Sequence, residues 1–370
     1  YRLLRLLAGD NATVCAVGDP DQAIYAFRGA DVENFLNFGK DFFGATEVTL
    51  NLNYRSSGNI ARASDRMIMK NARRIEKDLI AVRSDGPLIV AVSVPDEGAE
   101  GEFIVREIES RLDGLSHYRL PNIRNHKDFS DAPFCFSDFA VIFRTNNQAE
   151  AIEEKLAESG IPCRVLGRVN AGINTRTYNI VSALKQFSSI PENRNKLFEI
   201  KATDFLECFA RGHQLNNDQI TDLKSQIKLI FGDEWAEAMA GDLINEINLF
   251  TPSDDFDPRA EAVTLMTLHM AKGLEFRTIF ISGVEDGLIP YRKGNGLEDL
   301  EEERRLFYVG MTRAKDELFL LYKRTGFIYG KKSTRKPSPF LSDIPETFIQ
   351  RITINDKPKK SHPKQQMKLF

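Results

Sequence analysis

Two kinds of segment alternate along the chain. One kind is a short, nearly continuous apolar run, which is typical of a parallel strand buried on both faces. The other has apolar residues at three- and four-residue spacing, which predicts an amphipathic helix. Alternating strands and helices indicate βαβ units, so we expect an α/β fold with a mostly parallel sheet. Strands are predicted at Ala12–Val17, 46–50, 88–94, 138–145, 161–167, 262–269, 277–284 and 317–322.

Helical spacing gives a second set of expected elements. The first, YRLLRLLAG at residues 1–9, has the pattern of the last turns of an amphipathic helix, which indicates a fragment of a longer protein. Ser56 and Ser57 are placed to cap a helix that follows them. Further helices are expected at 102–112, 149–160 and 297–314.

Two regions depart from this alternation. Between about Asn170 and Pro258 the strand patterns disappear and polar helical segments take over, which predicts a helical insertion at 171–258. If the segments on either side share one sheet, this block is inserted into it. Beyond Pro345 the chain is polar and rich in lysine, which predicts a disordered basic tail at 346–370.

Composition argues against a disulfide-rich or membrane-spanning protein. The 370 residues are 42% hydrophobic and 28% charged, as in ordinary globular proteins, and the net charge of -3 means that any basic surface must be local. Cys15, Cys135, Cys163 and Cys208 have no spacing that suits a disulfide framework or a metal site. No apolar run is long enough to cross a bilayer. We expect a cytoplasmic protein.

The stretch VGDPDQAIYAFRGAD, Val17–Asp31, follows a predicted strand, and ligands gather at the carboxyl ends of strands in open parallel sheets. The Gln22 amide can donate and accept a hydrogen bond, so it can sense a phosphate, although taken alone a solvated loop amide is the more common case. Tyr25 and Phe27 can stack on bases and Arg28 can bind a backbone phosphate. Two aromatic residues at this spacing also fit a core.

Two further corners carry polar side chains. In NYRSS, Arg55 suits bidentate phosphate contact and Tyr54 can stack on a base, although such a pair is common on surfaces. In LMTLHMAKGLEF, Gly273 relieves a tight turn and Glu275 can accept a hydrogen bond from a ribose hydroxyl. His269 also fits a structural role. No second histidine or cysteine stands at ligand spacing, so no metal site is expected here.

The segment EEERRLFYVGMTRAKDEL, Glu301–Leu318, places Arg313 near the end of a predicted helix. An arginine delivered there can act as an arginine finger, which neutralises charge on a phosphoryl group during transfer. The charge pattern by itself favours a salt-bridged surface helix instead.

Taken in this order, VGDPDQAIYAFRGAD, LNLNYRSS, VTLMTLHMAKGLEF and EEERRLFYVGMTRAKDEL resemble the later motifs of UvrD/Rep/PcrA-type superfamily 1 DNA helicases. The stretch DFAVIFRTNNQAEAIEEKLAESGIPCRVLG is similar to the second motor domain of that family. The resemblance spans about Ala12 to Leu341, apart from the helical insertion. Four long motifs in order are specific, so the resemblance outweighs the structural alternatives above.

The resemblance implies an ATP-driven 3′-to-5′ translocase on single-stranded DNA, built from two RecA-like P-loop NTPase domains with accessory insertions. Residues 1–50 would be the remnant of the first motor domain, 51–170 with 259–345 the second, and 171–258 an accessory insertion. The implied cofactors are ATP and Mg²⁺. The implied substrate is single-stranded DNA or a duplex with a 3′ single-stranded tail, in DNA repair or replication.

The motif positions also imply residue roles. Gln22, Arg55 and Arg313 would contact the γ-phosphate, Tyr54 would stack on adenine, and Glu275 beside Gly273 would contact the ribose. Tyr25, Phe27 and Arg28 would line the DNA track, with His269 linking track and nucleotide.

Three departures from the family pattern matter. Phe27 stands where the family usually has tryptophan, so stacking should survive with less area. The insertion is shorter than the family's second accessory domain. The phosphate-binding G-x-x-x-x-G-K-[ST] segment and the acidic Mg²⁺-binding segment are absent, and GFIYGKKS, Gly326–Ser333, is only a near miss. We therefore expect residues 1–370 alone not to hydrolyse ATP and the metal to be held mainly elsewhere.

The chain ends in QMKLF, which resembles the short peptide by which bacterial proteins dock on the DNA sliding clamp. Gln366, Leu369 and Phe370 would be the anchors. A disordered segment can place such anchors in a preformed groove. A frayed basic tail whose lysines touch DNA phosphate is the other interpretation.

Two other functions remain open. One is a non-catalytic DNA-binding or clamp-tethered adaptor that keeps the RecA-like fold, which upstream sequence without a P-loop would favour. The other is the motor part of a helicase-nuclease of the RecB or AddA kind, but no nuclease carboxylate cluster follows the last predicted strand.

Overall fold

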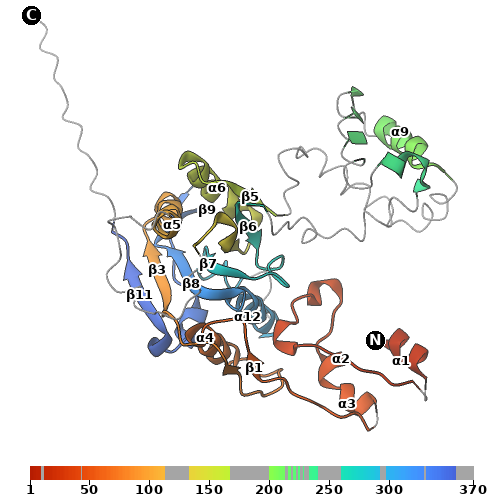
Figure 1. Ribbon diagram of the computed structural model, residues 1–370, viewed down its shortest axis with the longest axis horizontal. Coiled ribbons are helices and arrows are strands. Elements are labelled where there is room, and N and C mark those ends of the chain that lie inside the picture. The colour runs from red at the N-terminus through yellow and green to blue at the C-terminus, as the bar shows by residue number, and fades with distance from the viewer. Residues whose placement is uncertain are drawn as a thin grey trace, which may run out of the picture.

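In the computed structural model, one sheet has helices on both faces (Figure 1). The structure describes residues 1–9, 12–42, 44–112, 133–166, 200–212, 216–217, 220–221, 224–225, 228, 233–240, 260–291, 297–328 and 331–355.

The main sheet has seven strands in the order β11-β3-β8-β7-β4-β6-β5, and all neighbours are parallel. Every residue of β3 and β4 is buried, as expected for central strands covered on both faces. The predicted α/β fold with a parallel sheet is confirmed. The strands are β3 Ile89–Val94, β4 Phe139–Phe143, β5 Cys163–Val165, β6 Val263–Thr267, β7 Phe276–Ile281, β8 Ala314–Lys323 and β11 Ile349–Thr353.

Two apolar layers hold the helices to the sheet. Helices α4 (Gly58–Ile68) and α12 (Leu297–Met311) supply one layer, and α5 (Glu97–Leu112) and α6 (Ala149–Glu158) supply the other. Because side chains alternate along a strand, Ala91 of β3 packs in the first layer and Val92 in the second. This packing fixes the positions of α4 and α12 against the sheet.

The predicted helical insertion lies between β5 and β6, which are adjacent in the sheet. The segments on its two sides therefore share one sheet, as expected. Its described part contains α9 (Ala202–Gly212) and a short 3₁₀ helix at Asp233–Glu237. Most of the rest of the predicted insertion lies outside the described residues.

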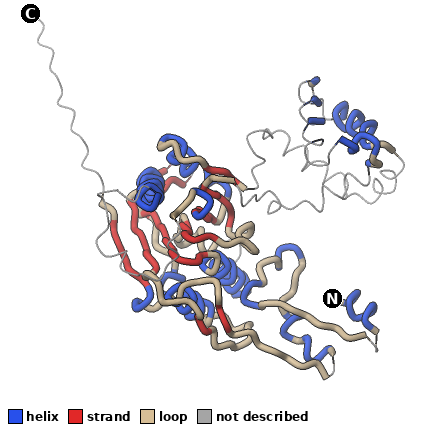
Figure 2. Tube along the Cα trace, in the orientation of Figure 1, coloured by secondary structure: helices blue, strands red, loops and turns tan. Residues whose placement is uncertain are grey.

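The strands predicted at Ala12–Val17 and 46–50 are wrong. Both stretches are extended without strand pairing in the described chain, and Figure 2 draws no strand before β1 (Leu52–Asn53), which pairs in parallel with β2 (Ile80–Ala81). A buried strand needs hydrogen-bonding neighbours, and none is present here among the described residues. The remaining elements of this part are α1 Arg2–Ala8, α2 Glu33–Leu36 and α3 Phe38–Asp41.

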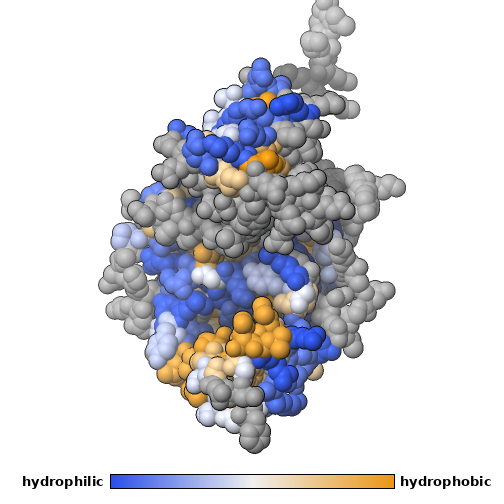
Figure 3. All heavy atoms as spheres, turned by 90° about the vertical axis from the view of Figure 1, so that its right-hand side faces the viewer, coloured by the Kyte–Doolittle hydropathy of each residue, from blue (hydrophilic) through white to orange (hydrophobic). Residues whose placement is uncertain are grey.

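Large apolar side chains near the amino terminus are exposed. Leu7 of α1 is 77% exposed, and Val17, Val48 and Leu50 are 88%, 76% and 80% exposed. Figure 3 shows an apolar patch on this side of the molecule. Within the described chain, no helix is both long and apolar enough to span a membrane.

The predicted capping role of Ser56 and Ser57 is wrong. Ser57 occupies the N-cap position of α4 without a capping hydrogen bond from its side chain. The Ser56 hydroxyl instead donates to the carbonyl of Ala314, 2.7 Å away, which ties the corner before α4 to the start of β8.

The carboxyl-terminal region is more ordered than its composition indicates. The predicted disordered tail at 346–370 is wrong over its first part, because β11 pairs with β3 at the edge of the main sheet. An edge strand has one open side and tolerates polar residues, so Gln350, Arg351 and Thr353 stand beside Ile349 and Ile352, which pack in the first and second layers. Residues 356–370 lie outside the described part.

The near miss for a phosphate loop, Gly326–Ser333, lies in an antiparallel pair formed by β9 (Thr325–Ile328) and β10 (Lys331–Thr334). A phosphate loop connects a strand to the amino terminus of a helix. This segment therefore has the wrong structure for that role, in agreement with its irregular spacing.

Candidate functional site

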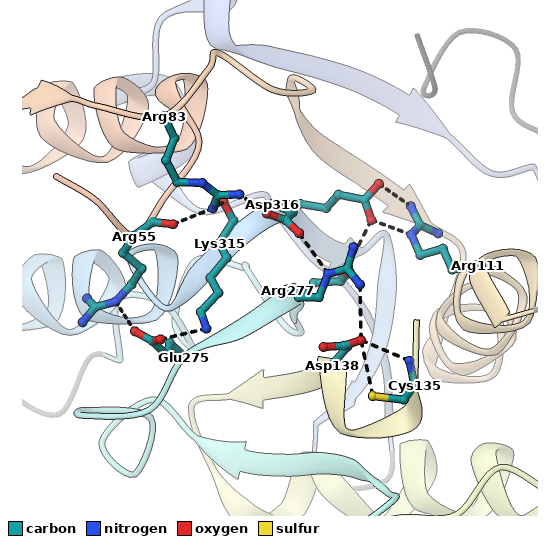
Figure 4. A network of polar contacts seen from close by, with 11 residues as sticks. Arg55, Arg83, Arg111, Cys135, Asp138, Glu275, Arg277, Lys315 and Asp316 are labelled. Carbon is teal, nitrogen blue, oxygen red and sulfur yellow. Dashed lines mark hydrogen bonds and ion pairs between the residues drawn. The ribbon is translucent and has the colours of Figure 1, made fainter. Parts of the chain in front are cut away.

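Two predicted site residues, Glu275 and Arg313, lie near the amino ends of β7 and β8. Phe276 and Ala314 begin these strands and are paired in register, so Glu275 and Arg313, which precede them, are brought close. The sequence placed these corners where strands leave the sheet, whereas the structure places them where strands enter it. A cavity of about 390 Å³ is lined by Tyr54, Arg55, Arg83, Glu275, Arg277, Lys315 and Asp316 (Figure 4).

Glu275 is shared between two cations. Its Oε2 accepts a hydrogen bond from Arg55 Nε at 2.7 Å, and its Oε1 lies 2.7 Å from Lys315 Nζ. The hydrogen bond from Lys315, followed by that from Arg55, lowers the pKa of Glu275 to about 2. The carboxylate is ionised at neutral pH and is exposed at the cavity, so it can accept a further hydrogen bond from a ligand.

Hydrogen bonds to backbone groups hold the corner that carries Tyr54 and Arg55 in place. Asn53 Oδ1 accepts from the backbone N–H groups of Arg55 and Ser56, both at 3.0 Å. The Ser57 N–H donates to the Lys315 carbonyl at 2.8 Å. The Tyr54 side chain is 67% exposed, so its ring faces solvent and can stack on a ligand.

Arg313 lies in the interior. It is 2% exposed, and its Nε donates to the Val309 carbonyl at 3.0 Å while Nη2 donates to Thr312 Oγ1 at 3.0 Å. Its Nη1 donates to the Leu274 carbonyl at 3.4 Å. Burial, and then the charge of Arg55, lowers the pKa of Arg313 to about 10, so the guanidinium is still charged at neutral pH. Its positive charge is thus held just beneath the cavity.

Gln22 lies in a 3₁₀ turn, Pro20–Gln22, held from two directions. Its Nε2 donates to Asp19 Oδ2 at 2.8 Å, and its carbonyl accepts from Lys272 Nζ at 3.0 Å. Lys272 precedes Gly273, whose φ of +91° confirms the predicted tight turn. Burial, and then the charge of Arg313, lowers the pKa of Lys272. Lys272 therefore links the turn of Gln22 to the surroundings of Arg313 and Arg55.

The loop predicted to line a DNA track is not extended. Ala26–Arg28 form a 3₁₀ turn that ends at Gly29 with a φ of 82°. The Tyr25 ring packs against the core, with Lys272 Nζ at 5.0 Å and the Arg28 guanidinium at 5.8 Å from its centroid. The side chain of Phe27 lies outside the described part.

His269 lies after the carboxyl end of β6 and is partly buried. Burial, and then the charges of Arg144 and Arg28, lowers its pKa to about 4. The imidazole is therefore neutral at pH 7. The neutral imidazole can form hydrogen bonds with a ligand but carries no charge. Positive charge near His269 comes from Arg144 and Arg28.

Helix α12 is not the salt-bridged surface helix that its charge pattern allowed. Glu303, Arg304 and Arg305 are all at most 9% exposed. Arg305 donates to the Arg73 carbonyl at 3.1 Å, and the carboxylate of Glu301 accepts from the Ala72 N–H at 2.7 Å. The helix thus holds the segment after α4 in place. A second cavity of about 660 Å³ lies between it and residues 18–35.

Some predictions lie beyond what the structure describes. Gln366, Leu369 and Phe370 fall outside the described residues. Within the described chain, no group of three or more His, Cys, Asp or Glu side chains is arranged to hold a metal ion.

Three contributors to the site escaped the sequence prediction. Lys272 stands in the predicted segment with Glu275, and Lys315 follows Arg313 by two positions, so both had a local signal. Arg83 had none, because it contacts the carbonyl of Arg55 from 28 positions away.

Comparison with known proteins identifies the family. The family model of the UvrD-like helicase C-terminal domain matches residues 48–171 and 174–325. The chain belongs to the UvrD-like helicases. The model of the UvrD/REP helicase N-terminal domain matches residues 1–43, which include the turn of Gln22.

Two relatives are ATP-dependent DNA helicases PcrA from Staphylococcus. That of S. aureus strain MRSA252 is 28% identical over 446 aligned residues, covering 97% of this chain and 58% of its own length. That of S. epidermidis strain ATCC 35984 is 28% identical over 449 residues, covering 100% of this chain and 59% of its own. The chain therefore spans less than two thirds of these relatives.

A crystal structure of the C-terminal domain of a possible DNA helicase from Lactobacillus plantarum WCFS1 also aligns. It covers 81% of this chain and 98% of its own chain, at 13% identity and a TM-score of 0.38.

Proposed function

We propose that this UvrD-like chain is the carboxyl-terminal part of an ATP-driven 3′-to-5′ DNA helicase or single-stranded DNA translocase in bacterial DNA repair or replication. The observation that carries the proposal is the arrangement of Arg55, Glu275 and Lys315 around one cavity, with Arg313 beneath it. Lys272 connects this group to Gln22. A cytoplasmic location is part of the proposal, as for bacterial enzymes that act on chromosomal DNA.

The cavity suits the adenosine and phosphates of ATP. Its lining includes Arg55, Arg83, Arg277 and Lys315 against the carboxylates of Glu275 and Asp316, so positive charge is in excess. The exposed Tyr54 ring offers a face for the adenine, and the ionised Glu275 can accept from a ribose hydroxyl. ATP supplies the free energy of phosphoryl transfer. We assign no Mg²⁺ ligands to the described residues and propose that the metal is held elsewhere.

Gln22, Arg55 and Arg313 are the proposed γ-phosphate contacts. The side-chain donors of Gln22 and Arg313 are bonded here to Asp19 and to the Val309 carbonyl, respectively. A bound γ-phosphate competes for both donors because an ionised acceptor makes stronger hydrogen bonds than a carbonyl. We propose that this exchange transmits the state of the nucleotide to the neighbouring loop, where Tyr25 and Arg28, with His269, contact DNA.

The first experiment is DNA-stimulated ATPase of the complete natural protein, with Glu275→Gln and Arg313→Lys. The carboxamide keeps the shape of Glu275 but loses its charge, and Lys keeps the charge of Arg313 but loses its planar set of donors. Glu275→Gln should raise KM for ATP and Arg313→Lys should lose turnover, whereas Lys155→Met, whose exposed ion pair with Glu158 lies on α6, should change neither. An unchanged KM in Glu275→Gln together with full turnover in Arg313→Lys would refute the assignment.

The direction of unwinding and the inactivity expected of residues 1–370 alone need separate tests. Unwinding should require a 3′ single-stranded tail, and equal unwinding from a 5′ tail would contradict the proposed direction. Residues 1–370 alone should show no ATPase, because they contain no phosphate-binding G-x-x-x-x-G-K-[ST] segment. DNA binding by the complete protein without any ATPase would instead favour the adaptor function.

Docking on the bacterial sliding clamp is proposed from the sequence QMKLF. Deleting Gln366–Phe370 should abolish recovery of the complete protein on immobilised clamp. Replacing Lys359 and Lys360 by Gln is the matched control, because it removes positive charge from the tail but leaves the anchors. Unchanged recovery after the deletion would refute clamp docking.

A further inference from the structure

Arg83 lines the cavity and joins its two sides. Its Nη1 donates to the carbonyl of Arg55 at 2.6 Å and to the carbonyl of Lys315 at 2.9 Å. Its Nη2 donates to Asp316 Oδ1 at 2.6 Å. Figure 4 shows the Arg83 guanidinium between the corner of Arg55 and the start of β8, which carries Lys315 and Asp316.

The two carbonyls belong to the residues that hold Glu275. Arg55 and Lys315 each bind one oxygen of its carboxylate, so the distance between their backbones determines whether both contacts can form at once. Apart from Arg83, the Ser57 N–H also bonds the Lys315 carbonyl. Arg83 is the side chain that contacts the Arg55 and Lys315 carbonyls together.

Asp316 anchors Arg83 to the main sheet. Its side chain is 5% exposed, and its second oxygen accepts from Arg277 Nε at 3.1 Å. Arg277 in turn lies 3.5 Å from Asp138, beside β4. The position of Arg83 is therefore set by three strands of the sheet rather than by its own loop.

We infer that Arg83 is a positioning residue for nucleotide binding. It fixes the separation between the corner of Tyr54 and Arg55 and the strand of Lys315, and so keeps Glu275 shared between two cations. Arg83 acts through these residues and need not touch the nucleotide. The inference rests on the proposed function, because it assigns ATP to this cavity.

The affected contacts include Tyr54 and Glu275, the proposed adenosine contacts, and Arg55, a proposed γ-phosphate contact. Adenosine contacts act equally on the ground state and the transition state, so their loss raises KM, whereas displacement of Arg55 lowers kcat. Hydrogen bonds to charged groups are strong enough that loss of the Arg83 contacts should raise KM for ATP roughly tenfold.

The test measures ATPase kinetics of the complete natural protein with saturating single-stranded DNA. Arg83→Met removes every donor while keeping much of the stem, and Arg83→Lys keeps the charge but cannot bridge two carbonyls and Asp316 in one plane. We expect KM for ATP to rise about tenfold in Arg83→Met and by less in Arg83→Lys, with a smaller fall in kcat through Arg55.

Arg62→Met is the matched control. Arg62 makes a comparable 2.6 Å ion pair with Asp85, its side chain is 38% exposed against 29% for Arg83, and it is not in the cavity. Thermal melting of all variants separates loss of folding from loss of positioning. An Arg83→Met protein with the same KM as Arg62→Met would overturn the inference.

A double-mutant cycle locates the effect. If Arg83 acts through Glu275, the rise in KM for Arg83→Met combined with Glu275→Gln should be less than the product of the two single effects. Independent effects would contradict the inference even if Arg83→Met alone raised KM. A raised KM in Glu275→Gln with a normal Arg83→Met would leave the proposed function intact and reject only the role of Arg83.

Discussion

Arg74 donates a hydrogen bond to the buried carboxylate of Asp21 at 3.0 Å, although 53 positions separate them in the chain. The Asp21 side chain is fully buried and that of Arg74 is 7% exposed. Lys77 lies 3.2 Å from the same carboxylate, and Arg74 also lies 3.6 Å from Asp65 of α4. These ion pairs fasten the turn of Gln22 to the segment between α4 and β2.

Arg74→Met should destabilise the fold. It leaves Asp21 buried with Lys77 as its remaining ion-pair partner in the described structure, and breaking a buried pair costs about 3 kcal/mol or more. Urea denaturation of residues 1–370 measures this. Arg351→Met is the control, because its exposed pair with Glu346 should be worth less than about 1 kcal/mol. Equal losses in the two variants would show that the buried pair adds no stability.

Lys77 should affect catalysis through Asp19. Asp19 Oδ1 accepts from Lys77 Nζ at 2.7 Å while Oδ2 accepts from the Gln22 amide. Lys77→Met releases this carboxylate and, under the proposed function, misplaces Gln22. Small misplacement of a positioned group can cost up to about a hundredfold in rate, so we expect kcat to fall by roughly ten- to a hundredfold.

Steady-state ATPase of the complete natural protein checks the Lys77 prediction. KM for ATP should change little, since the cavity at Glu275 is untouched. Lys201→Met, which removes an exposed pair with Glu237, is the control. A Lys77→Met protein with normal kcat would mean that Asp19 positions Gln22 without help from Lys77.

The sequence predicted the interior of the sheet well because central parallel strands are apolar at every position. β3 and β4 follow directly from their apolar runs. The same pattern at Ala12–Val17 gave a wrong strand, since a pattern does not reveal whether pairing neighbours are present. β11 was missed for the opposite reason, because an edge strand tolerates polar residues on its exposed positions.

The site was predictable only in part. Gln22, Arg55, Glu275 and Arg313 stand in segments that resemble a known family. In the structure Arg55 and Glu275 line one cavity, whereas Gln22 lines the other. Their partners Arg83 and Arg74 reach them from distant parts of the chain, so nothing in the local pattern marks them. The burial of Arg313 was likewise invisible, because an arginine near a helix end is ordinarily solvated.

His269 should make stability depend on pH. Its pKa of about 4 in the folded protein lies below its ordinary value of 6.5, so the unfolded chain binds the proton more readily. Its contribution is fully present above pH 6.5 and is lost progressively as pH falls towards 4. Denaturation midpoints of residues 1–370 between these pH values measure the slope. His269→Gln should flatten it, and an unchanged slope would exclude His269 as the source.

Gly310 allows α12 to approach the sheet closely. A Cβ at this position would lie 2.4 Å from Leu268 Cδ2 and 3.3 Å from Ile281 Cδ1, both in the core between helix and sheet. Gly310→Ala should therefore destabilise by about 1–3 kcal/mol through overpacking, although alanine favours helices. Gly98→Ala on α5 is the matched control, because its nearest contact would be Asp96 Oδ1 at 3.5 Å.

Urea denaturation should give opposite signs for the two glycine variants. Gly98→Ala should be neutral or stabilise by up to about 1 kcal/mol, since it restricts the unfolded chain without a clash. Because α12 leads directly into Arg313 and Lys315, Gly310→Ala should also raise KM for ATP in the complete natural protein. A Gly310→Ala protein as stable as Gly98→Ala would mean that Leu268 can move aside at no cost, and that the spacing between α12 and the sheet is not fixed by this contact.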